Sequence, residues 1–134
     1  MTITAVQLSK IATLASKAKI EKHLPALNAT LAKYNINTPL RISHFLAQVL
    51  HESGCFRWME EIASGSAYER RLDLGNVMSG DGIRFKGRGA IQLTGRSNYT
   101  LYGKFLKVDL LSNPSLVASV YPLDVAGWFW ETNG

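Results

Sequence analysis

The chain has 134 residues, of which 46% are hydrophobic and 19% charged, a composition that can build a core and excludes an intrinsically disordered protein. This length predicts a single compact domain. Lys and Arg outnumber Asp and Glu by 15 to 10, and residues 69–107 carry eight basic side chains against three acidic ones. A basic central segment favours an anionic partner, such as nucleic acid, a membrane surface or an acidic wall polymer.

Several classes of protein are excluded by what the sequence lacks. No run of about 20 apolar residues is present, so we expect no stable membrane insertion. The N-terminus has no basic segment ahead of its apolar residues, which argues against a signal peptide. Cys55 is the only cysteine, so an internal disulfide framework is excluded. We therefore expect a cytoplasmic location.

The N-terminal third has the apolar spacing of amphipathic helices. Residues 4–15 predict one short helix. The next apolar stripe predicts a second helix with Pro25 in its first turn, where the missing N–H costs nothing. The members of that stripe lie three or four residues apart: Leu24, Leu27, Leu31 and Tyr34.

The strongest periodic segment follows Thr38-Pro39, a helix-start signal in which Thr38 is the N-cap. We expect this helix to end near Gly54, since glycine commonly caps a helix C-terminus. Its buried stripe is predicted to be Ile42, Phe45, Leu46, Val49 and Leu50. Its polar positions are His44, Gln48, His51 and Glu52.

Glycines are dense from residue 62 to 96, which predicts loops and short strands. Residues 83–93 partly alternate apolar and polar, a pattern that allows a short β-hairpin. Helical spacing returns at 97–106, breaks at Asn113-Pro114 and returns at 123–130, with Trp130 on its apolar face. The fold class is therefore mainly α (α+β), with one small β element.

The run HESGCFRWMEE brings three carboxylates close together in sequence. Glu52 lies in the last predicted turn, where the negative end of the helix dipole and the flanking Leu50 and Phe56 would raise its pKa. A raised pKa suits a general acid that works near neutral pH. The alternative is a solvated glutamate at a helix end.

Glycoside cleavage needs a second carboxylate across the scissile bond. Glu60, Glu61 and Glu69 are all candidates, and periodicity does not choose between them. Glu61 could fold back towards Glu52 once the helix ends. For Glu60 and Glu69 the alternative is an ion pair with one of three nearby arginines, Arg57, Arg70 or Arg71.

Other patterns in the sequence carry weaker signals. His51 and Cys55 have the spacing of a metal pair, but Gly54 should end the helix between them, so we expect no metal and no cofactor. The glycines of KGRGAIQLTG could approach an anion, although the run matches neither phosphate-binding fingerprint. Gln92 and Thr94 would share one face of an extended segment and could hold a water molecule or a sugar hydroxyl, or only stabilise a turn.

The three tryptophans could stack on sugar rings. For Trp128 and Trp130, in GWFWE, packing in the core is the simpler interpretation.

Five blocks occur in a consistent order: FLAQVLHESGCF, DLGN, GDG, FKGRGAIQLTGRSNY and AGWFW. Together they resemble glycoside hydrolase family 19, the chitinase-like enzymes, and most of all their phage-type endolysin branch. The likeness runs from about residue 22 to the end. It implies a lysozyme-like, mainly helical domain that cleaves β-1,4 bonds of chitin or peptidoglycan with inversion.

The resemblance also implies roles for individual residues. The general acid of the family falls on Glu52, its general base on Glu61, and the hydroxyl that helps to hold the attacking water on Thr94. Gln92 and Asn98 match positions that line the sugar-binding cleft. Glu69 lies in a block similar to the endolysin motif Y-E-G-R-x-D-L-G-N and is the reserve base.

Two neighbouring groups complete the expected site. We interpret His51 as a polar neighbour that orients Glu52 or caps the helix end. Arg88 is expected to bind substrate as one of four basic residues that would favour an anionic glycan over neutral chitin. The four are Arg84, Lys86, Arg88 and Arg96.

The sequence departs from the family pattern in three places. Cys55 replaces the second glycine of H-E-S-G-G, which would restrict the backbone. The stretch between Glu61 and Glu69 is short, and the last residues stop where relatives continue. We therefore expect 1–134 to form a single family 19-like catalytic domain that lacks the C-terminal part of the family fold.

Three functions compete. The first is a wall-degrading glycosidase, acting as a monomer on peptidoglycan or chitin and released to the wall by a holin. The second is a non-catalytic glycan-binding remnant of the same fold. The third, nucleic-acid binding, rests on charge alone, and we expect no nucleic-acid partner.

Overall fold

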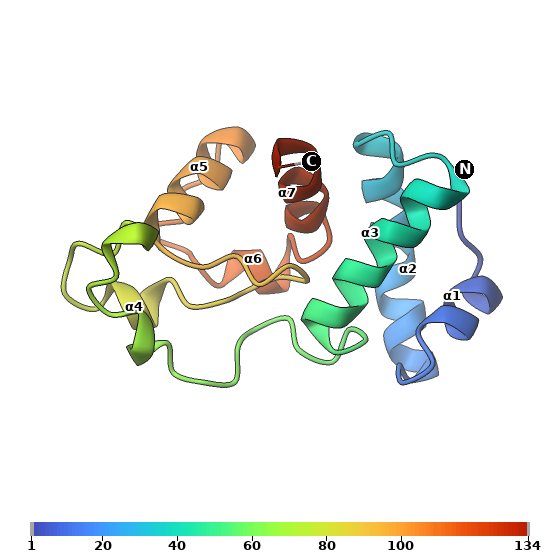
Figure 1. The fold of residues 1–134 in the computed structure, drawn as a ribbon, viewed down its shortest axis with the longest axis horizontal. Helices are drawn as coiled ribbons and strands as arrows, with labels where there is room; N and C mark the ends of the chain where they lie inside the picture. The colour runs from blue at the N-terminus through green and yellow to red at the C-terminus, as the bar shows by residue number, and fades with distance from the viewer. Residues whose placement is uncertain (1, 134) are drawn as a thin grey trace.

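Helices dominate the part of the chain that the computed structural model describes, residues 2–133. Three helices, α1 (Ala5–Ile11), α2 (Lys17–Lys33) and α3 (Pro39–Ser53), lie at one end of the molecule, as Figure 1 shows. Two others, α4 (Asp81–Arg84) and α5 (Arg96–Leu106), lie at the opposite end, with α6 (Leu116–Ser119) and α7 (Asp124–Asn133) between the two groups. The 3₁₀ turns η1 (Ser66–Tyr68) and η2 (Leu72–Leu74) precede α4. The mainly helical fold class is confirmed.

The helix α3 forms as its sequence predicts. Thr38 caps it by accepting a hydrogen bond from the Arg41 backbone N–H at 3.2 Å, and Pro39 occupies the first turn. Gly54 ends it in the left-handed conformation, with φ 58°. All five members of the predicted apolar stripe are buried, and the four polar positions, Glu52 among them, are exposed.

The prediction for Pro25 was wrong. The helix α2 begins at Lys17, where Ser16 accepts a hydrogen bond from the Lys19 N–H, so Pro25 lies in the helix interior. The buried Ile20 adds a turn to the apolar stripe, and its burial offsets part of the cost of an interior proline. Pro25 has no N–H to donate to the carbonyl four residues earlier in the helix. Pro25 is exposed, so water can reach that carbonyl.

The small β element is reduced to two isolated antiparallel bridges, Glu60–Arg88 and Arg88–Leu93, within residues 2–133. Backbone hydrogen bonds of 3.1 and 2.8 Å join Arg88 and Leu93 in both directions across a tight turn. Ile83 and Arg84, which the hairpin was expected to include, belong instead to α4. The turn fixes Gln92 and Thr94 beside Arg88.

The helix α7 packs closely on α2. A methyl group on Gly127 would come within 2.6 Å of the Thr30 side chain, so only glycine allows this approach. Beside it, Asp124 accepts hydrogen bonds from the Tyr34 hydroxyl at 3.1 Å and the Tyr102 hydroxyl at 2.6 Å. Lys33 adds an ion pair at 2.7 Å. This one carboxylate therefore joins α2, α5 and α7.

One apolar core runs through both ends of the molecule. Its fully buried aromatic side chains come from the helices and from the connecting loops. They are Phe45, Phe56, Phe85, Tyr99 and Tyr102. None of the described helices is long and apolar enough to cross a membrane.

Candidate active site

Glu61 is held by three hydrogen bonds on the segment that follows α3. Its backbone N–H donates to the Gly87 carbonyl at 2.8 Å, and its Oε1 accepts the Gly87 N–H at 2.9 Å. Its Oε2 accepts the Tyr68 hydroxyl at 2.9 Å. The same contact, together with burial, raises the pKa of Tyr68 and keeps that hydroxyl a donor. The carboxylate therefore has a fixed position.

Three polar side chains converge on Gly87. A methyl group built on this residue would lie 2.8 Å from Gln92 Oε1, 3.2 Å from Glu61 Oε1 and 3.4 Å from Thr94 Oγ1. We call Glu61, Gly87, Gln92 and Thr94 the Gly87 cluster. The structure thus brings together three of the residues that the sequence selected, around a point that only a glycine leaves free.

The turn that carries Gln92 is conformationally unusual. Gln92 has a left-handed backbone, with φ 56°, a conformation that costs a non-glycine residue about 1–2 kcal/mol. Its amide donates to the Gly89 carbonyl at 3.0 Å, and the Thr94 hydroxyl donates to the Gln92 carbonyl at 2.9 Å. Asn98 donates from its amide to the Thr94 carbonyl at 2.9 Å. Asn98 thus supports the turn from the first part of α5.

Glu52 lies in the last turn of α3, and its side chain is exposed. Leu50 and Phe56, which were expected to desolvate it, are buried and turned into the core. Within residues 2–133, no hydrogen bond joins Glu52 to His51 or to Glu61. The desolvation predicted from the sequence is therefore wrong for the free chain.

Backbone contacts hold the segment that runs from the end of α3 to Glu61. The Trp58 N–H donates to the Ser53 carbonyl at 2.9 Å, and the Gly89 N–H donates to the Met59 carbonyl at 2.6 Å. The segment between Glu52 and Glu61 is thus anchored to the helix at one end and to the glycine-rich turn at the other.

The residue that replaces the family's second glycine adopts a conformation suited to glycine. Cys55 has φ 57°, and Phe56 follows with φ 67°. Phe56 is fully buried, and its N–H donates to the Ser53 hydroxyl at 3.0 Å. Core burial and this hydrogen bond hold a tight turn that the Cys55 side chain disfavours.

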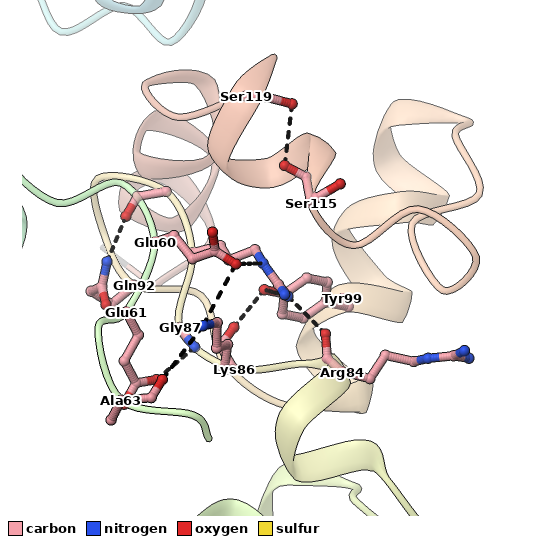
Figure 2. A network of polar contacts seen from close by, with 12 residues as sticks. Glu60, Glu61, Ala63, Arg84, Lys86, Gly87, Gln92, Tyr99, Ser115 and Ser119 are labelled. Carbon is pink, nitrogen blue, oxygen red and sulfur yellow. Dashed lines mark hydrogen bonds and ion pairs between the residues drawn. The ribbon is translucent and has the colours of Figure 1, made fainter. Parts of the chain in front are cut away.

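Glu60, which is half-exposed, forms an ion pair with the enclosed Arg88. Figure 2 shows Glu60 with the neighbouring Arg84 and Tyr99. The Arg88 Nε donates to Glu60 Oε1 at 3.0 Å, while its Nη1 donates to the Arg84 carbonyl at 2.7 Å and to the Tyr99 hydroxyl at 3.2 Å. Only 8% of the Arg88 side chain is exposed. Burial raises the pKa of Tyr99 to about 12. The guanidinium expected to meet substrate is thus enclosed by the protein.

Two further members of the predicted cationic group are also ion-paired, although Lys86 shares its carboxylate with Arg88. Lys86 lies 3.7 Å from Glu60, and Arg96 pairs with the buried Asp81 at 2.8 Å. Arg96 holds the pKa of Asp81 below its usual value. Of the four basic residues expected to attract an anionic glycan, Arg84 alone makes no ion pair within residues 2–133.

Glu69 serves as a cap for α4. Its Oε2 accepts the Gly80 N–H and its Oε1 the Gly82 N–H, both at 2.9 Å. These two donors hold the pKa of Glu69 below its ordinary value. The expected partner was one of three arginines, Arg57, Arg70 or Arg71. Glu69 binds backbone amides instead, because the start of α4 presents N–H groups that have no partner within the helix.

The three tryptophans differ in exposure: Trp128 is buried, whereas Trp58 is accessible to solvent. Trp128 is buried in the core, as expected, and Trp130 packs edge-on against Phe45 with ring centroids 5.5 Å apart. Trp58 is 41% exposed, and the Arg57 guanidinium lies 5.2 Å from its ring. Of the three, Trp58 offers the largest accessible surface beside Glu52 in the chain.

Sequence reasoning missed two members of the site. Tyr68 precedes Glu69 in the run AYERRLDLGN. Its hydroxyl donates to Glu61, a tertiary contact for which the run carries no signal. Gly87 gave no separate signal, because its role depends on tertiary convergence. Within residues 2–133, no group of three or more His, Cys, Asp and Glu residues could hold a metal ion.

Comparisons with known proteins identify the family of the chain. The family model described as chitinase class I matches residues 24–134. A glycosyl hydrolase family 19 domain-containing protein of Haemophilus influenzae is 30% identical over an alignment of 164 residues, which covers 98% of this chain and 79% of that protein. An endochitinase of Arabidopsis thaliana is 39% identical over 94 residues, with 69% of this chain and 32% of the relative covered.

Solved structures show the same fold. Chitinase C from Streptomyces griseus superposes with a TM-score of 0.72 at 22% identity, covering 96% of this chain and 54% of the chitinase. The class IV chitinase of Zea mays gives a TM-score of 0.68 at 23% identity, covering 97% of this chain and 70% of the other. The chain thus spans about a third of the plant endochitinase and about half of chitinase C. By its family match and its relatives, the chain belongs to glycoside hydrolase family 19.

Proposed function

We propose that the protein hydrolyses β-1,4 glycosidic bonds of an amino-sugar polymer with inversion of configuration. Membership of the family supports the reaction class. The observation that carries the proposal is the convergence of Glu61, Gln92 and Thr94 oxygens on one point beside Gly87. An inverting glycosidase needs a place of this kind, because a water molecule must be held and deprotonated on the face opposite the leaving group.

In this proposal Glu61 is the general base. Its position is fixed by Gly87 and Tyr68, and each of its oxygens retains a lone pair for the proton of the attacking water. The Thr94 hydroxyl, which donates to the Gln92 carbonyl, can accept a hydrogen bond from the same water. The base and the hydroxyl therefore orient one nucleophile before substrate arrives.

Glu52 is the proposed general acid. It is exposed in the free chain, so only a bound glycan would remove it from water. A sugar ring stacked on Trp58 would cover this end of α3. The acid is therefore completed by substrate, whereas the base is formed by the fold.

Peptidoglycan is the proposed substrate, with chitin as the alternative that the names of the relatives support. The net charge of +5 favours an anionic polymer, and the exposed Arg84 remains free of ion pairs within the described residues. The protein would act as a monomer and reach the wall from the cytoplasm through a holin. These finer assignments follow from the sequence resemblance and from charge.

The test is digestion of purified peptidoglycan and of chitin, with products identified by mass spectrometry, by the wild type and Glu52→Gln. We expect the wild type to release reducing-end fragments and Glu52→Gln to lose about 10²–10⁴-fold in rate. The melting temperature should hardly change, because the Glu52 side chain makes no hydrogen bond within the described residues. Normal turnover by Glu52→Gln would overturn the assignment of the acid.

A non-catalytic glycan-binding domain is the second candidate. The exposure of Glu52 in the free chain favours it. Its signature would be sedimentation of the folded protein with peptidoglycan while neither polymer yields fragments. The digestion and a sedimentation assay on the same samples separate the two functions.

A further inference from the structure

A cavity of about 390 Å³ lies between α2, the segment after α3 and the residues that follow α6. Three basic side chains line it: Lys19, Lys22 and Arg57. None of its described lining residues is acidic, and none of the three cations makes an ion pair within residues 2–133. Cations held together without a counter-charge repel one another, which favours the binding of an anion.

A buried histidine completes this cavity. His23 also lines it, is only 4% exposed, and has an Nε2 atom that is buried without a hydrogen-bond partner. Its ring packs against the buried Phe56, with centroids 5.2 Å apart. A buried polar atom without a partner costs about 1–3 kcal/mol, and a ligand would have to displace neighbouring atoms to reach this one.

The electrostatics of the imidazole reflect the same cluster. Burial, followed by the charges of Lys22 and Lys19, lowers the pKa of His23 to about 4. Both lysines therefore disfavour the charged form of the ring. A bound dianion would reverse their effect and supply an acceptor for a protonated ring.

The remaining wall of the cavity is apolar. It includes Met59, Val120 and Pro122. The volume exceeds that of a single inorganic phosphate, so the cavity has room for carbon atoms beside the anion. We propose that this cavity is a binding site for an organic phosphate, in which Lys19, Lys22 and Arg57 hold the phosphate oxygens, His23 contacts the ligand and the apolar wall covers the attached carbon group.

The site is separate from the Gly87 cluster, with which it shares no residue, and the inference does not depend on hydrolysis. It does adjoin the active site in sequence, since Arg57 and Met59 belong to the segment between Glu52 and Glu61. An occupant would therefore also hold that segment, whose Met59 carbonyl accepts the Gly89 N–H.

The test is titration of the whole protein with glycerol 3-phosphate, inorganic phosphate and, at matched ionic strength, sodium chloride. The readouts are the His23 imidazole resonances, with the exposed His44 as an internal reference, and the melting temperature. We expect saturable shifts of His23 with both phosphates, tighter with glycerol 3-phosphate, and no saturation with chloride.

The decisive variant is Lys19→Gln/Lys22→Gln, which removes two of the three charges from helix positions that are not fully buried. It should bind glycerol 3-phosphate about tenfold or more weakly. Lys10→Gln/Lys104→Gln removes the same charge elsewhere and should bind as the wild type does. Both variants carry the same net charge and should therefore digest glycan at the same rate as each other.

Two results would overturn the proposal. One is a His23 response to phosphates that does not saturate or that matches chloride at equal ionic strength. The other is unchanged binding by Lys19→Gln/Lys22→Gln. Binding of inorganic phosphate without glycerol 3-phosphate would overturn the organic ligand class.

Discussion

Glu61 and Gly87 bind each other in both directions, because the Glu61 N–H donates to the Gly87 carbonyl at 2.8 Å while the Gly87 N–H donates to Glu61 Oε1 at 2.9 Å. A side chain and its own backbone are thus fixed by one residue of the glycine-rich turn. That residue also leaves free the point where Gln92 and Thr94 converge. The proposed base and the place of its water therefore depend on the same glycine.

Gly87→Ala tests this dependence. The added methyl would lie 2.8 Å from Gln92 Oε1 and 3.2 Å from Glu61 Oε1, where the attacking water is proposed to bind. We expect glycan hydrolysis to fall about a hundredfold or more, with a loss of about 1–3 kcal/mol in the free energy of unfolding. Reducing-end release and urea unfolding measure the two effects.

Gly80→Ala is the matched control. Its methyl would meet no atom within 4 Å, but its φ of 90° makes the substitution strained. We expect a loss of stability with hydrolysis per folded molecule unchanged. Full turnover by Gly87→Ala would remove the water site from the proposal.

Glu69 offers a test of the reserve base. Both of its oxygens accept backbone N–H groups, from Gly80 and Gly82, so we expect Glu69→Ala to lower the melting temperature and to leave turnover per folded molecule unchanged. The melting temperature of Glu69→Gln should lie between those of the wild type and Glu69→Ala, because the amide of Gln keeps one acceptor oxygen. Thermal unfolding and a digestion assay are run on the same samples. Lost turnover at an unchanged melting temperature would instead make Glu69 the base.

The sequence predicts α3 well because both of its ends carry chemical signals. Thr38 and Gly54 cap the two ends of the helix, and the apolar stripe between them defines a single buried face. Such local signals fail at Pro25, because the first turn of α2 is stabilised by tertiary burial of Ile20. Propensity is a weak guide where packing decides.

Periodicity could not choose between Glu60 and Glu61, and only the family resemblance selected Glu61. The two residues are adjacent, so in extended backbone their side chains point to opposite faces. The bridge between Glu60 and Arg88 assigns one face to the ion pair and leaves the other to Gly87. The burial of Arg88 could not be predicted either, because it depends on tertiary contacts with Glu60, Arg84 and Tyr99.

Arg88→Ala against Arg84→Ala measures what that burial contributes. Removal of the Arg88 guanidinium leaves the Tyr99 hydroxyl and the Arg84 carbonyl without its hydrogen bonds, although the half-exposed Glu60 regains water. We expect a loss of about 2–4 kcal/mol in the free energy of unfolding. Arg84→Ala keeps the carbonyl and removes an exposed side chain, so it should change stability by about 0.5 kcal/mol or less. Equal urea midpoints for the two variants would contradict the buried network.

Acid should destabilise the protein through His23. The folded pKa of about 4 lies below the value of 6.5 for an ordinary histidine, so between these values the unfolded chain binds a proton that the folded chain does not. His23 therefore has no effect above pH 6.5, and the free energy of unfolding falls with pH below it, by up to about 1.4 kcal/mol per pH unit.

Urea unfolding at pH values from 7 to 4.5, in a buffer free of phosphate, measures this slope. His23→Leu should lose it, because the side chain no longer titrates and the unpartnered Nε2 is gone. His44→Gln, at an exposed position of α3, should keep the wild-type slope. Carboxylates titrate in all three proteins, so the difference between the curves isolates His23. Parallel curves for the wild type and His23→Leu would show that the pKa of the buried imidazole is not lowered.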